Sequence, residues 1–80
     1  MKINEAVKKR IIELCDTHGI TINKLGIISG VSRTTIGNIT GTRNSSPTVS
    51  TIKKLCDGLE IDIIEFFTSD IFRSLEQEIE

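Results

Sequence analysis

Apolar residues recur along the chain at the intervals of amphipathic helices. The first such stripe consists of Val7, Ile11, Leu14 and Cys15. Residues three or four positions apart lie on the same face of an α-helix, so the stripe predicts a helix in the first part of the chain. Asn4 is a suitable N-cap for this helix, and His18 followed by Gly19 supplies the cation and the glycine typical of a helix end.

The next stripe predicts a helix from about Ile22 to Ser29, with Thr21 as its cap. Its inward side chains should be Ile22, Leu25 and Ile28 or Ser29. Gly26 lies in the middle of this face. A glycine inside a helix destabilises the helix by about 1 kcal/mol relative to alanine. The close approach of another helix would explain this glycine, because it has no Cβ in the way.

A tight turn separates this helix from a third one. Gly30 can adopt positive φ, Val31 points back into the core, and Ser32 can cap the new helix. The inner face of the third helix should contain Thr35, Ile36 and Ile39. Its outer face contains Arg33, Thr34, Gly37 and Asn38. This outer face therefore has polar groups and a glycine but no acid.

A polar loop rich in turn formers, GTRNSSP, covers residues 41 to 47. Thr48 can then cap a fourth helix that stops near Gly58. Its inward residues should be Ile52, Leu55, Cys56 and Leu59.

The clearest helix start is the capping box of Asp62 and Glu65, flanked by Ile61 and Phe66 as a hydrophobic staple. The residues expected to close the core are Ile64, Phe66 and Phe67. A last amphipathic turn or helix is suggested by Ile71, Phe72, Leu75 and Ile79. Because no strand pattern or repeat occurs, we predict an all-α fold. A compact five-helix domain should cover residues 1–69, and an acidic amphipathic tail residues 70–80.

Size and composition limit the possible functions. The chain has 80 residues, of which 38% are hydrophobic and 26% charged, which is typical of one small globular domain. It has no apolar run of about 20 residues, the length that a membrane helix needs, and no signal-peptide pattern at its start. The cytoplasm is therefore the expected location.

The two cysteines, Cys15 and Cys56, lie within apolar helical stripes and should be buried hydrophobic residues. A disulfide between them would require their helices to pack side by side. One histidine and two distant cysteines form no recognisable zinc site. Cys15 and His18 could be imagined as a nucleophile pair, but no third group orients them. We therefore expect no metal, no cofactor and no enzymatic activity.

Charge is distributed unevenly along the chain. Its formal net charge is only −1, yet residues 17–56 contain five basic residues and no acid. Residues 57–80, in contrast, contain one basic residue and eight acids. Because a polyanion responds to the local field, the basic middle favours a nucleic-acid partner despite the overall charge.

Two short helices joined by a glycine-containing turn form a helix-turn-helix unit, here centred on residues 29 to 32. The second helix of such a unit enters the major groove. Arg33 can pair with guanine, Asn38 with adenine, and Thr34 can use its hydroxyl or methyl group. The basic middle has no aromatic residue for stacking on single strands, so duplex DNA is the expected partner.

The sequence resembles the phage lambda repressor-like, Cro/C1-type (XRE) helix-turn-helix family. The resemblance covers about residues 5 to 68 and is carried by TINKLGIISGVSRTTIGNITG, PTVSTIKKLCDGLEI and DIIEFF. It implies base contacts by Arg33, Thr34 and Asn38. It also implies phosphate contacts by Ser32, Thr42, Arg43, Asn23 and Thr21. Three positions depart from the family pattern, since Ile22 replaces a usual glutamine, Gly26 a usual alanine and Thr42 a usual loop glycine.

We therefore predict a sequence-specific transcriptional regulator, a repressor in its simplest form, from a bacterium or phage. It should bind a palindromic double-stranded DNA operator as a homodimer. The alternative is a protein-interaction module, antitoxin-like or antirepressor, that uses this fold without specific DNA binding. No membrane partner or small-molecule ligand is implied.

We expect the dimer surface to be an apolar stripe of the tail, which would be exposed to solvent in a monomer. The stripe consists of Ile71, Phe72, Leu75 and Ile79. In the alternative arrangement, Ile71 and Phe72 fold back onto the core of the same chain. The tail acids Glu76, Glu78 and Glu80 should face solvent, away from DNA.

Overall fold

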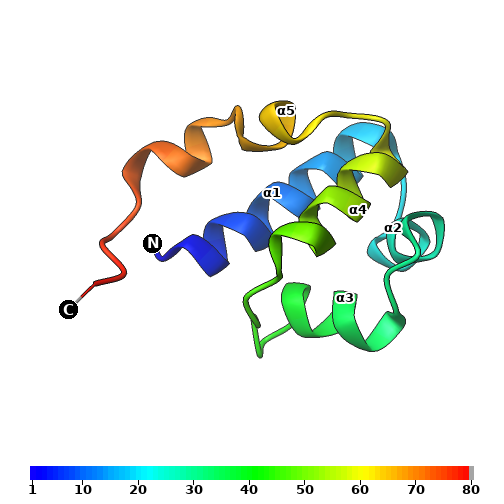
Figure 1. The fold of residues 1–80 in the computed structure, drawn as a ribbon, viewed down its shortest axis with the longest axis horizontal. Coiled ribbons are helices and arrows are strands. Elements are labelled where there is room, and N and C mark those ends of the chain that lie inside the picture. Colours follow the sequence, from blue (N-terminus) through cyan, green and yellow to red (C-terminus); the bar gives the residue numbers. More distant parts are fainter. Residues whose placement is uncertain (80) are drawn as a thin grey trace.

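The computed structural model describes residues 1–79, which contain helices and no strand. The helices are α1 (Ile3–His18), α2 (Ile22–Ser29), α3 (Arg33–Thr40), α4 (Val49–Leu59), α5 (Ile63–Phe67) and the 3-10 helix η1 (Asp70–Ser74) (Figure 1). The all-α class with five helices and a short helical tail is confirmed. Glu80, predicted to be one of the solvent-facing tail acids, lies outside the described residues.

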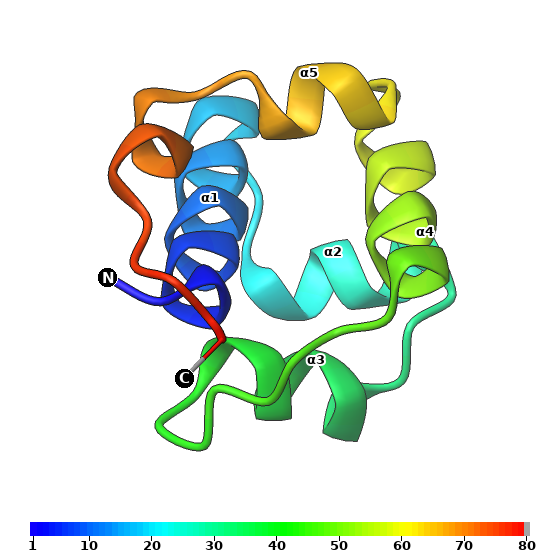
Figure 2. The same ribbon diagram turned by 60° about the vertical axis from the view of Figure 1, so that its left-hand side comes forward.

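The helices enclose one core. α1 and α4 stand on two sides of the molecule, α2 and α5 bridge them at opposite ends, and α3 lies outside α2 (Figure 2). Each helix contributes apolar side chains to the centre, which contains Val7, Ile11, Leu14, Cys15, Leu25, Val31, Ile36, Ile39, Ile52, Leu55, Cys56, Leu59 and Phe66. The apolar stripes of the sequence therefore converge, and α3 keeps one face outside the core.

Short polar side chains cap four of the helices as predicted. The side chains of Thr21, Ser32, Thr48 and Asp62 each accept a hydrogen bond from the backbone N–H three residues later, at 2.7 to 3.1 Å. Each bond satisfies one of the amides that a helix start leaves without a partner.

The start of α1 corrects the prediction that Asn4 is its N-cap. The helix begins at Ile3, and the N-cap residue Lys2 makes no side-chain capping bond. An acceptor comes instead from the tail, where Oε2 of Glu78 accepts a hydrogen bond from the backbone N–H of Ile3 at 3.3 Å. Glu78, 75 positions from Ile3 in the sequence, therefore supplies the hydrogen-bond acceptor that we expected from Asn4.

Two glycines mark places where helices approach each other closely. A Cβ on Gly26 would lie 3.1 Å from the carbonyl oxygen of Val31 and 3.3 Å from Cγ2 of Ile36, so the predicted close approach is confirmed. α4 ends at Leu59, so the predicted stop near Gly58 is confirmed. Gly58 also lies against α2, where an added Cβ would lie 3.2 Å from Cα of Ser29.

Three residues predicted to face inward are exposed. Ile64 is 74% exposed and Phe67 39%, and Thr35 is exposed as well. Of the two alternatives in α2, Ile28 is exposed and Ser29 faces inward, against Gly58. α5 has only five residues, so it buries one large side chain, that of Phe66. The ring of Phe67 contacts its neighbours at steep angles, edge-to-face with Phe66 and tilted against Phe72, with centroid distances of 5.0 Å to both. The hydroxyl of Thr35 lies at the surface, where it accepts a hydrogen bond from Ser32 Oγ at 2.9 Å.

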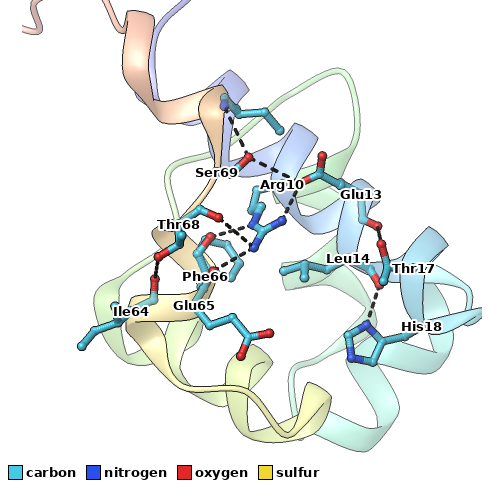
Figure 3. A network of polar contacts seen from close by, with 11 residues as sticks. Arg10, Glu13, Leu14, Thr17, His18, Ile64, Glu65, Phe66, Thr68 and Ser69 are labelled. Carbon is cyan, nitrogen blue, oxygen red and sulfur yellow. Dashed lines mark hydrogen bonds and ion pairs between the residues drawn. The ribbon is translucent and has the colours of Figure 1, made fainter.

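A single arginine joins α1 to the end of α5. Nε of Arg10 donates to the carbonyl of Phe66 at 2.7 Å, and Nη2 donates to that of Glu65 at 2.8 Å (Figure 3). Nη1 forms an ion pair with Glu13 at 2.5 Å. The Arg10 side chain is only 11% exposed, so these bonds are largely shielded from water and satisfy carbonyls that the helix end leaves free.

The tail folds back along α1. Phe72 is partly buried against the core, as in the alternative arrangement, and Ile71 and Leu75 are half-buried. Ile79 is 82% exposed. Beyond η1, the backbone N–H of Glu76 donates to the carbonyl of Met1 at 3.0 Å, so the two ends of the chain lie together (Figure 1).

Candidate nucleic-acid interface

The turn between α2 and α3 sets the direction of α3. Gly30 has φ +67°, the left-handed conformation that glycine adopts most easily, and Val31 is buried behind it. Ser32 then starts α3, which packs on the core through Ile36 and Ile39. The predicted turn and cap are confirmed, and they leave the opposite face of α3 on the molecular surface.

The outer face of α3 brings together the residues expected to read bases. Arg33, Thr34 and Gly37 are exposed, and Asn38 is half-buried. Among the described residues, the side chains of Arg33 and Asn38 have no hydrogen-bonding or ion-pairing partner. A Cβ added to Gly37 would meet no heavy atom within 4 Å, so the surface above this glycine is open. The donors of this face are therefore free to bind a ligand.

The loop after α3 contains two of the residues expected to contact phosphate. Thr42 and Arg43 are exposed, and Arg43 has no ion-pair partner in the part of the chain that the structure describes. The left-handed residue of this loop is Asn44, with φ +46°, rather than Thr42 at the position of the missing glycine. Sequence reasoning counts Asn44 among the polar loop residues that could contact phosphate but does not predict this conformation, although asparagine is one of the few residues that tolerate it.

The remaining expected contacts lie at the two helix starts. Thr21 and Asn23 are exposed at the start of α2, and Ser32 is exposed at the start of α3. The hydroxyl of Ser32 accepts from the N–H of Thr35 and donates to Oγ1 of Thr35, so both of its roles are already used within the helix. Ile22, which replaces the family's glutamine, is partly buried against the core and offers no polar group.

Most basic side chains of residues 17–56 are not neutralised by acids in the described part of the folded chain. Lys53 donates to Asp57, and this bond with the negative charge of Asp57 raises the pKa of Lys53. Arg33 and Lys54, in contrast, have no acidic partner among the described residues. The tail acids Glu76 and Glu78 are exposed, as predicted. Each also bonds at the start of the chain, Glu76 to the N-terminal ammonium at 3.1 Å and Glu78 to the backbone N–H of Ile3 at 3.3 Å.

The cysteines have no place in this interface. Cys15 and Cys56 are free and buried, as predicted, and burial raises the pKa of both thiols. Both should remain protonated near neutral pH, which makes them poor nucleophiles and poor metal ligands. No cluster of three or more metal-ligating side chains occurs in residues 1–79. Within the same residues, no helix is long and apolar enough to cross a membrane.

Comparisons with known proteins agree with this geometry. A family model described as the Cro/C1-type HTH DNA-binding domain matches residues 10–69. The crystal structure of the prophage Lp1 protein 11 is similar, with 29% sequence identity and a TM-score of 0.80, covering 94% of this chain and 100% of that one. A search of curated proteins finds no match. The matched residues include α2, the turn, α3 and the following loop, and they confirm the resemblance inferred from the sequence.

Proposed function

The chain belongs to the Cro/C1-type helix-turn-helix DNA-binding domain family, and from this premise we propose that it represses transcription by binding a specific operator as a homodimer. Membership implies a DNA-binding regulator of transcription and not an enzyme. The observation that carries the finer proposal is the outer face of α3, where unpaired polar groups are exposed within a segment free of acids. We also propose residues 1–69 as the DNA-binding domain and residues 70–80 as its tail.

Base recognition is assigned to α3. The guanidinium of Arg33 can donate two hydrogen bonds to O6 and N7 of guanine, and the amide of Asn38 can pair with adenine. Thr34 can contact either a polar edge or the thymine methyl group. The open surface over Gly37, which lies between Thr34 and Asn38, lets the helix approach the floor of the major groove.

Phosphate contacts are assigned to the loop and to the helix starts. Arg43 and Thr42 project from the loop, and Thr21 and Asn23 lie at the start of α2. Ser32 is the weakest member of this group, because its hydroxyl already bonds twice to Thr35. Contacts of this kind fix the register of the protein on the duplex without reading its sequence.

A second copy is needed because one α3 reads only a few base pairs. In helix-turn-helix dimers the two recognition helices bind half-sites about one turn, roughly 34 Å, apart. We propose that the tail supplies the contact through Ile79 and the exposed parts of Ile71 and Leu75, together with Phe67. Phe72 would support this surface from the inside, since it packs against both the core and Phe67.

Selection of bound sequences from random duplex DNA, followed by salt titration, tests the proposal. We expect a palindromic consensus and a slope of log K against log salt of roughly −4 to −7, corresponding to about 4 to 8 neutralised phosphates per dimer. Absence of binding even at about 50 mM salt would instead favour the protein-interaction module. Sedimentation of the chain truncated after Ser69 tests the dimer contact, because it should be monomeric. A truncated chain that stays dimeric places the contact elsewhere.

A further inference from the structure

We propose that Asn44 is a positioning residue for DNA recognition, which holds the end of α3 and the adjoining loop against α1. This inference rests on the proposed function and adds to it a residue that acts through others. Its side-chain amide is directed at backbone carbonyls of the protein itself. Specific binding should therefore depend on a group that need not touch the DNA.

The first observation concerns how α3 ends. α1 and α2 end on glycines in the left-handed conformation, Gly19 with φ +66° and Gly30 with φ +67°. Gly41, at the end of α3, is instead extended, with φ −87°. Nδ2 of Asn44 donates to the carbonyl of Ile39 at 3.0 Å. The loop residue Asn44 therefore satisfies a carbonyl that the end of the recognition helix leaves free.

The second observation is that the same amide reaches α1. Nδ2 of Asn44 also donates to the carbonyl of Asn4 at 3.0 Å, and Nδ2 of Asn4 donates to the carbonyl of Asn44 at 3.5 Å. On the other side of the loop, Nζ of Lys8 donates to the carbonyl of Gly41 at 3.3 Å. Thr42 and Arg43 lie between these two attachments, so α1 holds both ends of the segment that presents them.

The third observation is the residue type itself. Asn44 has φ +46°, a conformation that most residues adopt only with strain and that asparagine tolerates. A glycine would adopt it more easily but would have no amide to bind Asn4 and Ile39. The hydrogen bonds of the side chain compensate for the backbone conformation, and they connect the loop, α3 and α1 at a single point.

The test compares Asn44→Gly with the native chain and with Glu60→Gly. Glu60 is the matched control, because it is the other described residue that is not glycine and has positive φ, and it ends α4 outside the loop. Affinity is measured for the selected operator and for an unrelated duplex, at a temperature where circular dichroism shows all variants folded. Hydrogen exchange of the Ser45 amide, which donates to the carbonyl of Asn38 at 2.8 Å, reports on the loop without DNA.

For Asn44→Gly we expect the ratio of operator to unrelated-duplex affinity to fall about tenfold, the factor that the loss of two hydrogen bonds represents. The salt slope should stay within about one unit of the native value, because Arg43 remains in place. The Ser45 amide should exchange faster, whereas Glu60→Gly should match the native chain in every measurement.

Native Ser45 exchange in Asn44→Gly would overturn the proposal whether or not DNA binds. An affinity ratio within twofold of the native value would overturn it as well, since a merely structural residue lowers stability alone. If Asn44→Gly does not fold, Asn44→Asp replaces it, because aspartate tolerates the same backbone conformation but cannot donate to the carbonyls of Ile39 and Asn4. It should also lower the ratio about tenfold; an unchanged ratio again overturns the proposal. If the native chain binds no duplex while Ser45 exchange responds as expected, the proposed function fails and the loop attachment stands.

Discussion

The α2–turn–α3 segment and the α5–η1 segment each join two short helices, but they are held in different ways. The first relies on neighbours in sequence, with caps at Thr21 and Ser32, a left-handed Gly30, and Gly26 against Ile36. The second relies on α1, because Arg10 binds its carbonyls at 2.7 and 2.8 Å.

This difference separates the surface proposed for DNA recognition from the segment proposed for dimer formation. The local contacts should keep the turn and the start of α3 in place when the C-terminal region changes, which suits the surface proposed to read bases. The end of α3 depends in addition on α1, through Asn44. A segment held by bonds between distant residues can loosen without moving α3. Changes in the first segment should therefore affect folding and recognition together, and changes in the second should affect the C-terminal region first.

The largest expected effect comes from filling the contact within the first segment. Gly26→Val should lower the free energy of unfolding by about 3 kcal/mol, because the new side chain would overlap Val31 and Ile36. Urea denaturation measures this loss. Gly37→Ala is the matched control on α3, where the space is open; it should raise stability by about 1 kcal/mol and still weaken operator binding. Equal stability of the two variants would show that α2 and α3 are not tightly packed.

A somewhat smaller loss is expected from releasing the second segment. Arg10→Met keeps the aliphatic length but removes the bonds to Glu65 and Phe66, and should cost about 2 kcal/mol. Hydrogen exchange should accelerate in α5 and η1 while α3 keeps its native rates. Lys9→Met, an exposed change on the same helix, serves as control. Acceleration of α3 to the same extent would contradict the separation of the two segments.

Two further variants separate the proposed base contacts from the proposed phosphate contacts, and neither should change the stability of the fold. Arg33→Ala should weaken operator binding by about 1.5 kcal/mol, a little more than tenfold, and relax preference at one base pair per half-site. Arg43→Ala should weaken all duplexes alike and make the salt slope shallower. Fluorescence anisotropy with operator and unrelated duplexes measures both variants. If Arg33→Ala lowers both affinities by the same factor, its assignment to base contact is wrong.

The smallest effect should come from the tail acid at the start of α1. Glu78→Gln keeps the side-chain shape but removes the negative charge beside the N–H of Ile3, and should cost about 0.5 kcal/mol. Thermal unfolding at low and high salt checks this value, because screening should reduce the difference between the variants. Glu5→Gln, in the first turn of the same helix, is a matched control for charge alone. A larger loss from Glu5→Gln would mean that the tail contributes nothing specific.

Much of the fold could be predicted because its signals are local. A hydroxyl or carboxylate three residues before an amide predicts a cap at Thr21, Ser32, Thr48 and Asp62, and the geometry needs no other part of the chain. The outward residues of α3 could be predicted for the same reason, since helical periodicity alone separates them from Ile36 and Ile39. Their assignment to DNA contacts stays a prediction.

The errors occur where a distant partner competes with a local signal. Asn4 looks like a cap, but Glu78 supplies the acceptor and Asn4 bonds to Asn44. Periodicity could not show that α5 would bury Phe66 and leave Ile64 in water, because that choice depends on which helices lie beneath it.

The sequence by itself determined the number and order of the helices, the turn before α3 and the acid-free character of its surroundings. These properties follow from residue spacing and from bonds within one helical turn. Only the tertiary structure decided where the tail lies, that Arg10 binds the end of α5 and that Asn44 joins the loop to α1 by hydrogen bonds. Each of these depends on groups more than 35 positions apart, which meet only because the core places α1 beside them.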